Sequence, residues 1–438
     1  MALPPRILIV GGGVFGLSTA LSLSKRHPES EVTVVESSPT IPNPHGSSVD
    51  TSRIVRADYA NAAYSKLAAA AIHRWRSTDW GRDGRYTQNG LLLVYPEDSA
   101  SAKEYARKSY ANVRKIEGDN VIFLPTQADV LSVVPAYGST LDVAGGYVNW
   151  GSGWSDAAAS VHYAKTLLDA EERVSFRTGD VERVLYDMNG AKPKATGVVL
   201  TDGSTVEADL VVLATGAWTS KLVDLRGRAV ATGQAIAYMR ISDEEQRELE
   251  NLPTILNFAT GIFIIPPRDN LLKIARHAYG YRNPVEVSVP GGSGSMVISL
   301  PEQGVPVPVE GQDAFRVALR QLLPRFAERE FVDTRVCWYT DTPTGDFIVS
   351  YHPGHEGLFL ATGGSGHGFK FFPVIGDKIV DALEGTLDSE LGKMWKWPET
   401  AVSDEEDFDG DGSRSGERRA ILKDELAKTK KASRGSVL

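Results

Sequence analysis

The chain has 438 residues, of which 42% are hydrophobic and 24% are charged, and its formal net charge is -9. This length accommodates two or three domain-sized cores, and the acidic balance argues against a nucleic-acid partner, because phosphate binding requires a basic surface. The first residues, MALPPRILIVGGG, show no charged leader, and no segment is long enough to span a bilayer. With a single cysteine, the chain is expected in the cytoplasm without a membrane partner; its last residues, SVL, differ from the peroxisomal signal S-K-L.

A strand, a glycine turn and a helix are predicted in succession near the start of the chain. RILIV (Arg6–Val10) is followed by GGGVFG, and LSTALSLSKRH then changes to a helical period. Read as G-x-G-x-x-G, Gly11 makes the tight turn, Gly13 admits a pyrophosphate and Gly16 lets the helix pack on the strand. A second strand, EVTVVES, ends at Glu36, where an acid can accept hydrogen bonds from a ribose. These elements predict a dinucleotide site, although nicotinamide and flavin sites share such glycines.

Later segments predict further parts of the same domain. VSFRTGDVERVLYD and ATGVVLTDGSTVEAD read as a strand pair joined through the turn MNGAKPK, and VEADLVVLATGAW reads as a buried strand. GLFLATGGSGHGFKFFPVIGDKIVDALEG reads as a strand over 358–361, a glycine-rich turn and a helix that starts near Pro373. Such a turn places the positive end of a helix dipole beside a bound group, which suits the electron-rich side of a flavin.

Cys337, in RVCWYTDTPTGDFIV, is the single cysteine of the chain. It cannot form a disulfide within the chain or complete a thiolate metal cage. Two interpretations therefore remain, a small buried hydrophobic residue or a reactive thiol, and most free cysteines belong to the first class.

The segments CWYTDTPTGDFIV…HP and GGSGHGFK resemble the covalent-flavin cysteine segment and the flavin-cradling turn of the monomeric sarcosine oxidase and pipecolate oxidase family, whose fungal relatives include saccharopine oxidases and fructosyl amino acid oxidases. The resemblance runs from Arg6 to about Gly385, with the motifs in the family's order. It implies FAD as cofactor, attached through a thioether to Cys337, and Val181 beside the adenine. It also implies cofactor contacts from Ser47, Ser48, Ala214, Gly216, Trp218, Gly364, Gly366, Gly368 and Lys370.

Five polar residues are candidates for the chemistry. Arg53 and Arg56 are three residues apart in VDTSRIVRADY, and such a pair is usually a solvated helix face. The same holds for Lys273 and His277, four residues apart in LLKIARHAYGY. The resemblance implies instead that Arg53 lies beside the isoalloxazine and that Arg56 and Lys370 bind the substrate carboxylate, which suits the planar fork of arginine. It also implies that Lys273 activates oxygen as a fixed cation and that His277 shapes the pocket.

Two departures from the family bear on the substrate. Where sarcosine-type members carry a tyrosine pair, GIFIIPP places Phe263 and Ile264, which predicts an apolar wall for the substrate and argues against small N-methylglycine. The fructosyl amino acid oxidases carry an acid for sugar hydroxyls where this chain has Ala275 and Arg276, which makes sugar amines less favoured.

The acidic tail is expected to be a solvated linker. SDEEDFDGDGSRSG contains D-x-D-x-D-G from Asp407 to Gly412, the start of a calcium loop, but Arg418 stands at position twelve in place of Glu and no helical pattern flanks the motif. We therefore expect no bound metal and a mobile end. In the fructosyl amino acid oxidases a C-terminal arm supplies an arginine for the carboxylate, and Arg414 and Arg419 are the candidates here.

These features predict an α/β fold, with a Rossmann-like FAD-binding domain of the D-amino acid oxidase type and a second, α+β substrate domain on a mixed or antiparallel sheet. The FAD-binding domain is expected to comprise residues 1–85, 152–225 and 331–395, and the substrate domain residues 86–151 and 226–330. Helices are predicted in ISDEEQRELENLP and GQDAFRVALRQLLPRFAE. Residues 396–438 would form a C-terminal arm or mobile tail.

The predicted activity is that of an FAD-dependent oxidase. It would oxidise the secondary amine of an N-substituted or cyclic α-amino acid, of the pipecolate, N-methyl amino acid, saccharopine or fructosyl amino acid class, to an imine and pass the electrons to oxygen. The expected partners are this small molecule and oxygen, with the protein acting as a monomer. Three alternatives remain: a flavin dehydrogenase that reduces a partner, a nicotinamide-dependent dehydrogenase, and a flavin-binding module without activity.

Overall fold

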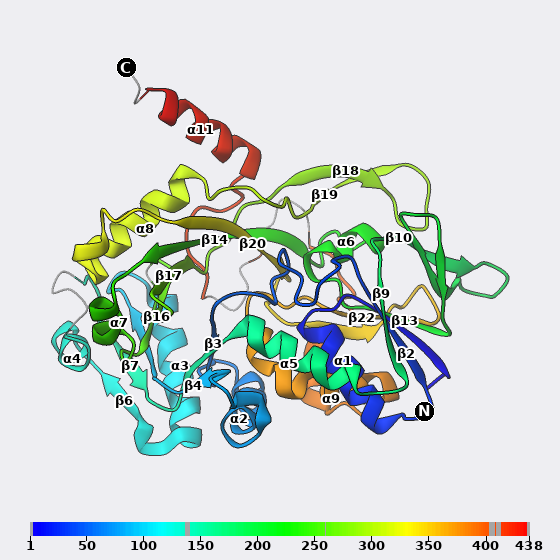
Figure 1. The fold of residues 1–438 in the computed structure, drawn as a ribbon, viewed down its shortest axis with the longest axis horizontal. Coiled ribbons are helices and arrows are strands. Elements are labelled where there is room, and N and C mark those ends of the chain that lie inside the picture. Colours follow the sequence, from blue (N-terminus) through cyan, green and yellow to red (C-terminus); the bar gives the residue numbers. More distant parts are fainter. Residues whose placement is uncertain (1–2, 136–140, 259, 403–407, 409–412, 436–438) are drawn as a thin grey trace.

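The computed structural model describes residues 3–135, 141–258, 260–402, 408 and 413–435. Two large sheets organise the chain, in the strand orders β21-β22-β13-β1-β2-β9 and β20-β14-β17-β16-β15-β5-β7-β6. In Figure 1 the first sheet lies to the right, above α1, α5 and α9, and the second lies to the left. This arrangement confirms the predicted α/β fold with two sheets.

The first sheet is parallel except at one edge. From that edge its strands are β21 (Ile348–Tyr351), β22 (Leu358–Thr362), β13 (Leu210–Leu213), β1 (Arg6–Val10), β2 (Glu31–Glu36) and β9 (Val174–Thr178). Only the pair of β21 with β22 is antiparallel. Parallel strands are covered on both faces, which explains the continuous apolar runs RILIV and LVVL.

Helices cover one face of the first sheet and a small antiparallel sheet covers the other. The helices are α1 (Val14–Arg26), α5 (Ala157–Asp169) and α9 (Phe372–Glu384). The small sheet comprises β10 (Val181–Asp187), β11 (Lys194–Leu200) and β12 (Thr205–Glu207). β10 and β11 pair across the predicted turn, and their valines share a core with Leu8 and Leu213.

α1 and α9 cross closely because a serine of one meets a glycine of the other. Ser18 Oγ donates a hydrogen bond to Phe372 O at 2.8 Å and accepts one from Gly376 N at 2.8 Å. A Cβ on Gly376 would collide with Ser18 O. The crossing therefore has no room for a side chain, and it aligns two helices whose N-termini both point toward the turns that follow β1 and β22.

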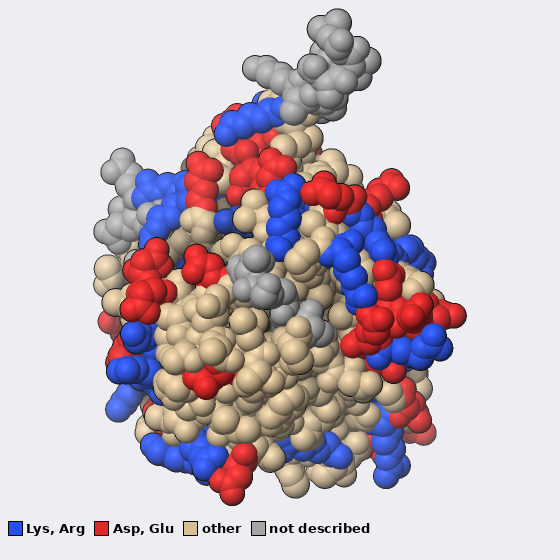
Figure 2. Space-filling model, turned by 90° about the vertical axis from the view of Figure 1, so that its left-hand side faces the viewer, with Lys and Arg blue, Asp and Glu red and all other residues tan. Residues whose placement is uncertain are grey.

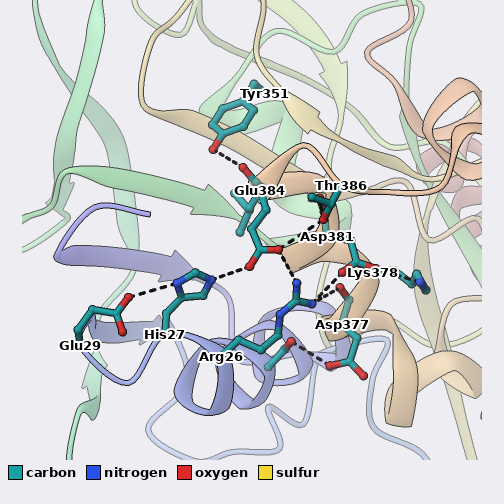
Figure 3. Close-up of polar contacts among 11 residues, drawn as sticks. Arg26, His27, Glu29, Tyr351, Asp377, Lys378, Asp381, Glu384 and Thr386 are labelled. Carbon is teal, nitrogen blue, oxygen red and sulfur yellow. Dashed lines mark hydrogen bonds and ion pairs between the residues drawn. The ribbon is translucent and has the colours of Figure 1, made fainter. Parts of the chain in front are cut away.

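The opposite ends of α1 and α9 are joined by charges, as Figure 3 shows. Arg26 forms ion pairs with Asp381 at 2.9 Å and Glu384 at 2.5 Å, and His27 Nε2 lies 2.7 Å from Glu384 Oε1. Arg26 lies in the last turn of α1, where a cation also stabilises the helix dipole.

The second sheet is mixed. Its strands are, in order, β20 (Asp333–Asp341), β14 (Val230–Arg240), β17 (Leu271–Arg276), β16 (Ile262–Arg268), β15 (Thr254–Asn257), β5 (Leu91–Tyr95), β7 (Gly145–Asn149) and β6 (Val121–Leu124). β15 and β5 are parallel, and the other neighbours are antiparallel.

Each face of the second sheet belongs to a different core. Phe263 and Ile265 of β16 lie in the core shared with the first sheet, whereas Ile262 and Ile264 lie in the core on the other side. That other core is covered by α4 (Gln127–Val133), α7 (Asp243–Leu249) and α8 (Val309–Leu322), and the last two are the helices predicted there.

The predicted domain boundary at residue 331 groups β20 with the FAD-binding domain, but β20 hydrogen-bonds with β14 in the second sheet. The strand thus brings Cys337 into that sheet, and the division of the chain into domains stays a prediction. The remaining elements are α2 (Ala62–Ser77), α3 (Ala100–Glu117), α6 (Thr219–Leu222), α10 (Ser389–Trp395), α11 (Leu422–Gly435), β3 (Arg53–Val55), β4 (Tyr86–Thr87), β8 (Gly153–Ser155), β18 (Pro284–Ser288) and β19 (Ser295–Ser299).

The C-terminal segment runs back over the second sheet and ends in α11, where the sequence suggested no helix. Tyr279 N donates to Ser415 O at 3.0 Å, and Ala278 and Ser415 form a parallel bridge. Most of the acidic motif from Asp407 to Gly412 lies outside the described residues. Within them, no group of three or more His, Cys, Asp or Glu side chains is arranged to hold a metal ion.

Charged residues of both signs are mixed on the surface. On the side of the molecule that carries α4, β6 and α7, Figure 2 shows Lys and Arg interspersed with Asp and Glu around a broad uncharged area. Among the described helices, none combines the length and the apolar character needed to cross a membrane.

The crossing of α1 and α9 generates a stability prediction. Gly376→Ala should lower the free energy of unfolding by about 1–3 kcal/mol, because the added methyl overpacks the contact with Ser18. Gly392→Ala in α10 is the matched control, since nothing lies within 4 Å of the added atom, and it should be neutral or stabilising. Thermal denaturation of both variants measures the difference, and equal melting temperatures would contradict the packing argument.

Candidate active site

A cavity of about 440 Å³ lies between the carboxyl ends of the first sheet and the facing side of the second. Its lining comes from the turns after β1, β2, β13 and β22, and from Leu256, Phe263 and Tyr339 of the second sheet. Open parallel sheets bind ligands at the carboxyl ends of their strands, where the strand order reverses. The cavity is therefore the candidate active site.

The first glycine turn has the geometry that the sequence motif predicts. Gly11 has a φ of 111°, which side chains rarely adopt, and a Cβ there would collide with Ala214 O. A Cβ on Gly16 would collide with Gly11 O, so this glycine serves the packing of α1 on β1. A Cβ on Gly13 would lie 2.9 Å from Ser48 Oγ. The turn thus keeps space open at the N-terminus of α1, where free N–H groups attract phosphate.

Side chains from the following loop brace this turn. Glu36 Oε2 accepts a hydrogen bond from Gly12 N at 2.8 Å, and Ser48 Oγ accepts one from Val14 N at 3.0 Å. Ser47 Oγ donates to Trp338 O of β20, so the loop also touches the second sheet. The glycine turn, the N-terminus of α1 and the carboxylate of Glu36 together fit a dinucleotide such as FAD.

Most of the predicted cofactor residues line the cavity. They are Gly11, Gly13, Glu36, Ser47, Ser48, Val181, Ala214, Gly216, Trp218, Gly364, Gly366, Gly368 and Lys370. Gly16 and Cys337 do not line it, the first because it lies under α1 and the second because it is buried in β20.

Two buried cations lie beside one tyrosine at the cavity. Arg56 Cζ is 4.8 Å and Lys370 Nζ is 5.1 Å from the centroid of the Tyr59 ring, and Lys370 Nζ donates to Tyr59 Oη at 2.7 Å. Both cations line the cavity, and Arg56 is 7% exposed. Its Nη1 has no hydrogen-bond partner among the described residues. A buried guanidinium N–H without a partner is costly, so this site is arranged to accept an anionic group such as a carboxylate.

Tyr59 also contacts a histidine of the second glycine turn. His367 Nε2 lies 2.8 Å from Gly345 O, which can only accept, so this nitrogen donates and Nδ1 can accept from Tyr59 Oη at 3.0 Å. Donation then runs from Lys370 to Tyr59, to His367 and to Gly345 O. The chain holds Lys370 at the cavity with its ammonium group fixed.

A buried carboxylate, Asp50, connects the other two predicted cations. Its Oδ2 accepts from Lys273 Nζ at 2.7 Å and from Arg53 Nη1 at 2.6 Å. Its Oδ1 accepts from Tyr238 Oη at 2.6 Å and from Thr51 N at 2.7 Å. The side chain of Asp50 is 0% exposed and that of Lys273 is 2% exposed.

Cys337 lies next to this cluster. Arg53 Nη2 is 3.4 Å from Cys337 Sγ and 3.0 Å from Ser47 O. Cys337 and Tyr339 are two residues apart on β20 and therefore point to the same side of the sheet, and Tyr339 lines the cavity. The buried thiol is thus two residues along β20 from Tyr339 of the cavity wall, and it lies beside the guanidinium group of Arg53.

Burial and charge shift the pKa values of these groups in opposite directions. Burial lowers the pKa of Lys273 to about 8, although Asp50 raises it in part. Burial would raise the pKa of Asp50, but Lys273 and Arg53 outweigh that effect and hold it well below its usual range. Burial raises the pKa of Asp58, which lies behind Arg56, and Arg56 opposes the rise.

Lys273 does not itself line the cavity. Its Nζ lies 5.9 Å from the centroid of the Phe263 ring, which does, and its second hydrogen bond goes to Ser52 O at 2.7 Å. Arg53 and His277 line the cavity directly.

Of the predicted apolar wall, only Phe263 faces the cavity. Ile264 belongs to the core behind the sheet, because neighbouring residues of a strand point to opposite faces. Ile264 is therefore not placed to contact a ligand in the cavity, and the apolar wall consists of Phe263 and Leu256.

The C-terminal arm contributes Ser413 and Arg414 to the lining. Ser413 Oγ lies 3.1 Å from His277 Nε2. Arg414 pairs with Asp341 and donates to Ala278 O at 2.8 Å and to Ser365 O at 3.0 Å. Of the two candidates from the sequence, Arg414 is the one at the cavity.

Family comparison decides the class of the protein. The DAO family, described as FAD dependent oxidoreductase, matches residues 6–382. The chain belongs to this family. The predicted FAD dependence, the fold class and the relationship to amine and amino acid oxidases are confirmed.

The oxidoreductase is similar over nearly its whole length to named oxidases. It is 33% identical to the amino acid oxidase imqH of Aspergillus flavus, over 91% of this chain and 98% of that protein. It is 30% identical to the L-saccharopine oxidase of Schizosaccharomyces pombe, over 90% of this chain and 93% of that protein. The crystal structure of a modified fructosyl peptide oxidase from Aspergillus nidulans in complex with FSA superposes with a TM-score of 0.86, at 26% identity, over 96% and 98% of the two chains.

Three residues of the oxidoreductase's site were missed from the sequence. Asp50 stands three residues before Arg53 in VDTSR, and an acid beside a predicted cation was the available signal. Tyr59 and His367 carried no such signal, because their roles depend on contacts between segments about 300 residues apart.

Proposed function

We propose that the oxidoreductase is an oxidase of the secondary amine of an N-substituted or cyclic α-amino acid. The observation that carries this proposal is the pair of buried cations at the cavity, Arg56 and Lys370; Arg56 Nη1 has no hydrogen-bond partner in the part of the chain that the structure describes. The names of its relatives, which include oxidases of amino acids and of L-saccharopine, support it.

The proposed reaction removes two hydrogens from the amine, one from carbon and one from nitrogen, and leaves an imine. Bound FAD supplies a two-electron acceptor for this chemistry. Oxygen finally gains the two electrons and two protons as hydrogen peroxide, and water hydrolyses the imine to a carbonyl group and an amine, which stay in one ring-opened molecule when the imine bond lies in a ring. The protein's contribution is to hold the carboxylate on Arg56 and Lys370, so that the C–N bond is fixed in the cavity.

The apolar side of the cavity favours substrates larger than N-methylglycine. Phe263 and Leu256 line this side. Arg276, which stands where fructosyl amino acid oxidases carry an acid, is paired with Glu310 at 2.6 Å. Pipecolate, larger N-methyl amino acids and saccharopine therefore fit the proposal better than sugar amines.

Lys273 is the proposed oxygen-activating cation. Its charge lies behind Phe263 in a buried environment, where electrostatic interactions act over longer distances than in water. A fixed positive charge stabilises the negative charge that oxygen acquires in the first electron transfer.

Cys337 is the proposed attachment point of FAD. Formation of the thioether replaces one C–H bond of a flavin methyl group and the S–H bond of Cys337, and the two electrons and two protons pass to oxygen as one hydrogen peroxide. Arg53 Nη2, 3.4 Å from the sulfur, is a cation beside the atom that would form the new bond. A monomeric state and a cytoplasmic location are the accompanying expectations.

The first test concerns carboxylate recognition. A peroxide-coupled assay over pipecolate, proline, N-methyl amino acids, saccharopine and fructosyl amino acids should identify a substrate whose decarboxylated analogue is poor. Arg56→Ala and Lys370→Ala should each lower kcat/KM by roughly tenfold to a thousandfold, since removing one partner of a buried charge pair costs about 2–5 kcal/mol. Equal turnover of the decarboxylated amine by the wild type would assign these cations another role.

The second test concerns the covalent link. Acid precipitation of the wild type should leave the yellow colour in the pellet, whereas Cys337→Ser should release it to the supernatant, because the serine hydroxyl is a far weaker nucleophile than a thiolate. Mass spectrometry of the peptide that contains residue 337 gives the mass of the adduct. Recovery of all FAD free in solution from the wild type would refute the attachment.

The third test concerns Lys273. Lys273→Met should slow the step with oxygen by about 100- to 1000-fold, the effect of removing one fixed electrostatic group, and should affect the amine step much less. In the wild type the oxygen step should be fast below pH 8 and decline as the pH rises through the lysine's pKa of about 8, because only the protonated form carries charge. Stopped-flow absorbance times the two steps separately. An oxygen step that Lys273→Met leaves unchanged would favour a dehydrogenase that reduces a partner.

A further inference from the structure

The carboxylate of Asp50 lies outside the cavity lining and yet touches the two cations to which the proposed function gives roles. One oxygen, Oδ2, accepts from both Lys273 and Arg53. The other oxygen accepts from the neutral donors Tyr238 Oη and Thr51 N. Asp50 thus has both oxygens occupied by donors of this chain, and it cannot serve as a ligand for substrate without releasing one of them.

Positive charge outweighs negative charge around Lys273. Lys273 itself lies on β17. Of the charged groups that face it, Asp50 lies in the loop before β3 and Arg53 lies on β3. β20 contributes Arg335, whose Nη2 donates to Val49 O at 2.8 Å, together with the Cys337 thiol. β14 contributes the Tyr238 phenol. The cluster therefore holds three cations against one carboxylate.

We propose that Asp50 is a positioning residue that keeps Lys273 charged for the oxygen step and holds Arg53 against Cys337 for attachment of FAD. The inference rests on the roles that the proposed function gives to Lys273 and Cys337. It adds that one carboxylate supports both roles.

The chemistry of the three cations explains why Lys273 depends on Asp50. Arginine stays protonated under all conditions that a folded protein tolerates, whereas a buried lysine releases its proton readily. Without Asp50, two arginines would face Lys273 in a site shielded from water. Lys273 is then the group that loses its charge, and a neutral amine no longer stabilises the anion that forms from oxygen.

The position of the Arg53 guanidinium group also depends on Asp50. Arg53 Nη1 is held by Asp50 at 2.6 Å while Nη2 points to Cys337 Sγ and Ser47 O. The carboxylate thus fixes the plane of the guanidinium group. An asparagine in its place has the same shape, but its amide nitrogen takes the position of one carboxylate oxygen and donates where that oxygen accepts. In one orientation the bonds from Lys273 and Arg53 are lost, and in the other the bond from Thr51 N is lost.

The test uses the purified, FAD-loaded Asp50→Asn variant. The flavin is reduced anaerobically with dithionite, oxygen is added in the stopped-flow instrument, and the rate is followed from pH 6 to pH 9. The midpoint of its pH dependence should move at least one unit below that of the wild type, so that the rate at pH 8 falls by about fivefold or more and recovers toward pH 6. Lys273→Met should show a slow rate without this recovery.

Asp58→Asn is the matched control, because Asp58 is equally buried but faces Arg56. It should alter the amine step and leave the midpoint of the oxygen step in place. An unchanged midpoint in Asp50→Asn, or the same shift in Asp58→Asn, would overturn the inference. Since dithionite replaces the amine, these results do not depend on the identity of the substrate, and a failure of the proposed amine oxidation would instead appear as no reduction by any amine.

Covalent attachment gives a second readout that requires no turnover. The fraction of flavin that stays in the acid-precipitated pellet should fall in Asp50→Asn relative to the wild type. If this variant does not accumulate as folded protein, Asp50→Asn/Lys273→Met, which removes one charge of each sign, is compared with Lys273→Met. A lower covalent fraction in the double variant supports the inference, and equal fractions overturn it.

Discussion

The buried carboxylate of Asp50 is the constraint on which the rest of the site depends. Its loop leaves the first sheet after β2, and its partners Lys273 and Tyr238 belong to the second sheet. The ion pair between Asp50 and Lys273 therefore connects the loop after β2 of the first sheet to β17 of the second sheet. From this fixed point the loop places Ser48 on the N-terminus of α1, Ser47 on the backbone of β20 and Arg53 on Cys337. Breaking a buried pair by removing one partner leaves an uncompensated charge, which is strongly unfavourable.

The charged residues around the cavity are arranged in two layers. Cations that line it, Arg53, Arg56 and Lys370, face the space a ligand would take, while two carboxylates lie behind the wall, Asp50 beside Arg53 and Asp58 near Arg56. The helices α1 and α9 add two positive dipole ends. The cavity thus presents positive charge at several points, which fits the phosphates of a dinucleotide and, in the proposed function, the carboxylate of an amino acid and the charge that oxygen acquires.

The sequence predicted those structural features that depend on residues close together in the chain. The strand, glycine turn and helix from Arg6 to Arg26 could be located to within three residues, because they follow one another directly in the chain. It could not decide between Phe263 and Ile264, since the face of a strand that meets the cavity is set by the neighbouring strands. Nor could it select Asp50 among 56 acidic residues, because burial of a carboxylate between two cations is a property of the assembled sheets.

The central claim is that one carboxylate holds the cation for oxygen and the cation beside the thiol at the same time. The most direct measurement is a crystal structure of the yellow, FAD-loaded protein. We expect continuous density between Cys337 Sγ and the flavin, with Asp50 Oδ2 still within hydrogen-bond distance of both Lys273 Nζ and Arg53 Nη1. An unmodified Cys337, or a Lys273 side chain turned away from Asp50 to another carboxylate, would contradict it.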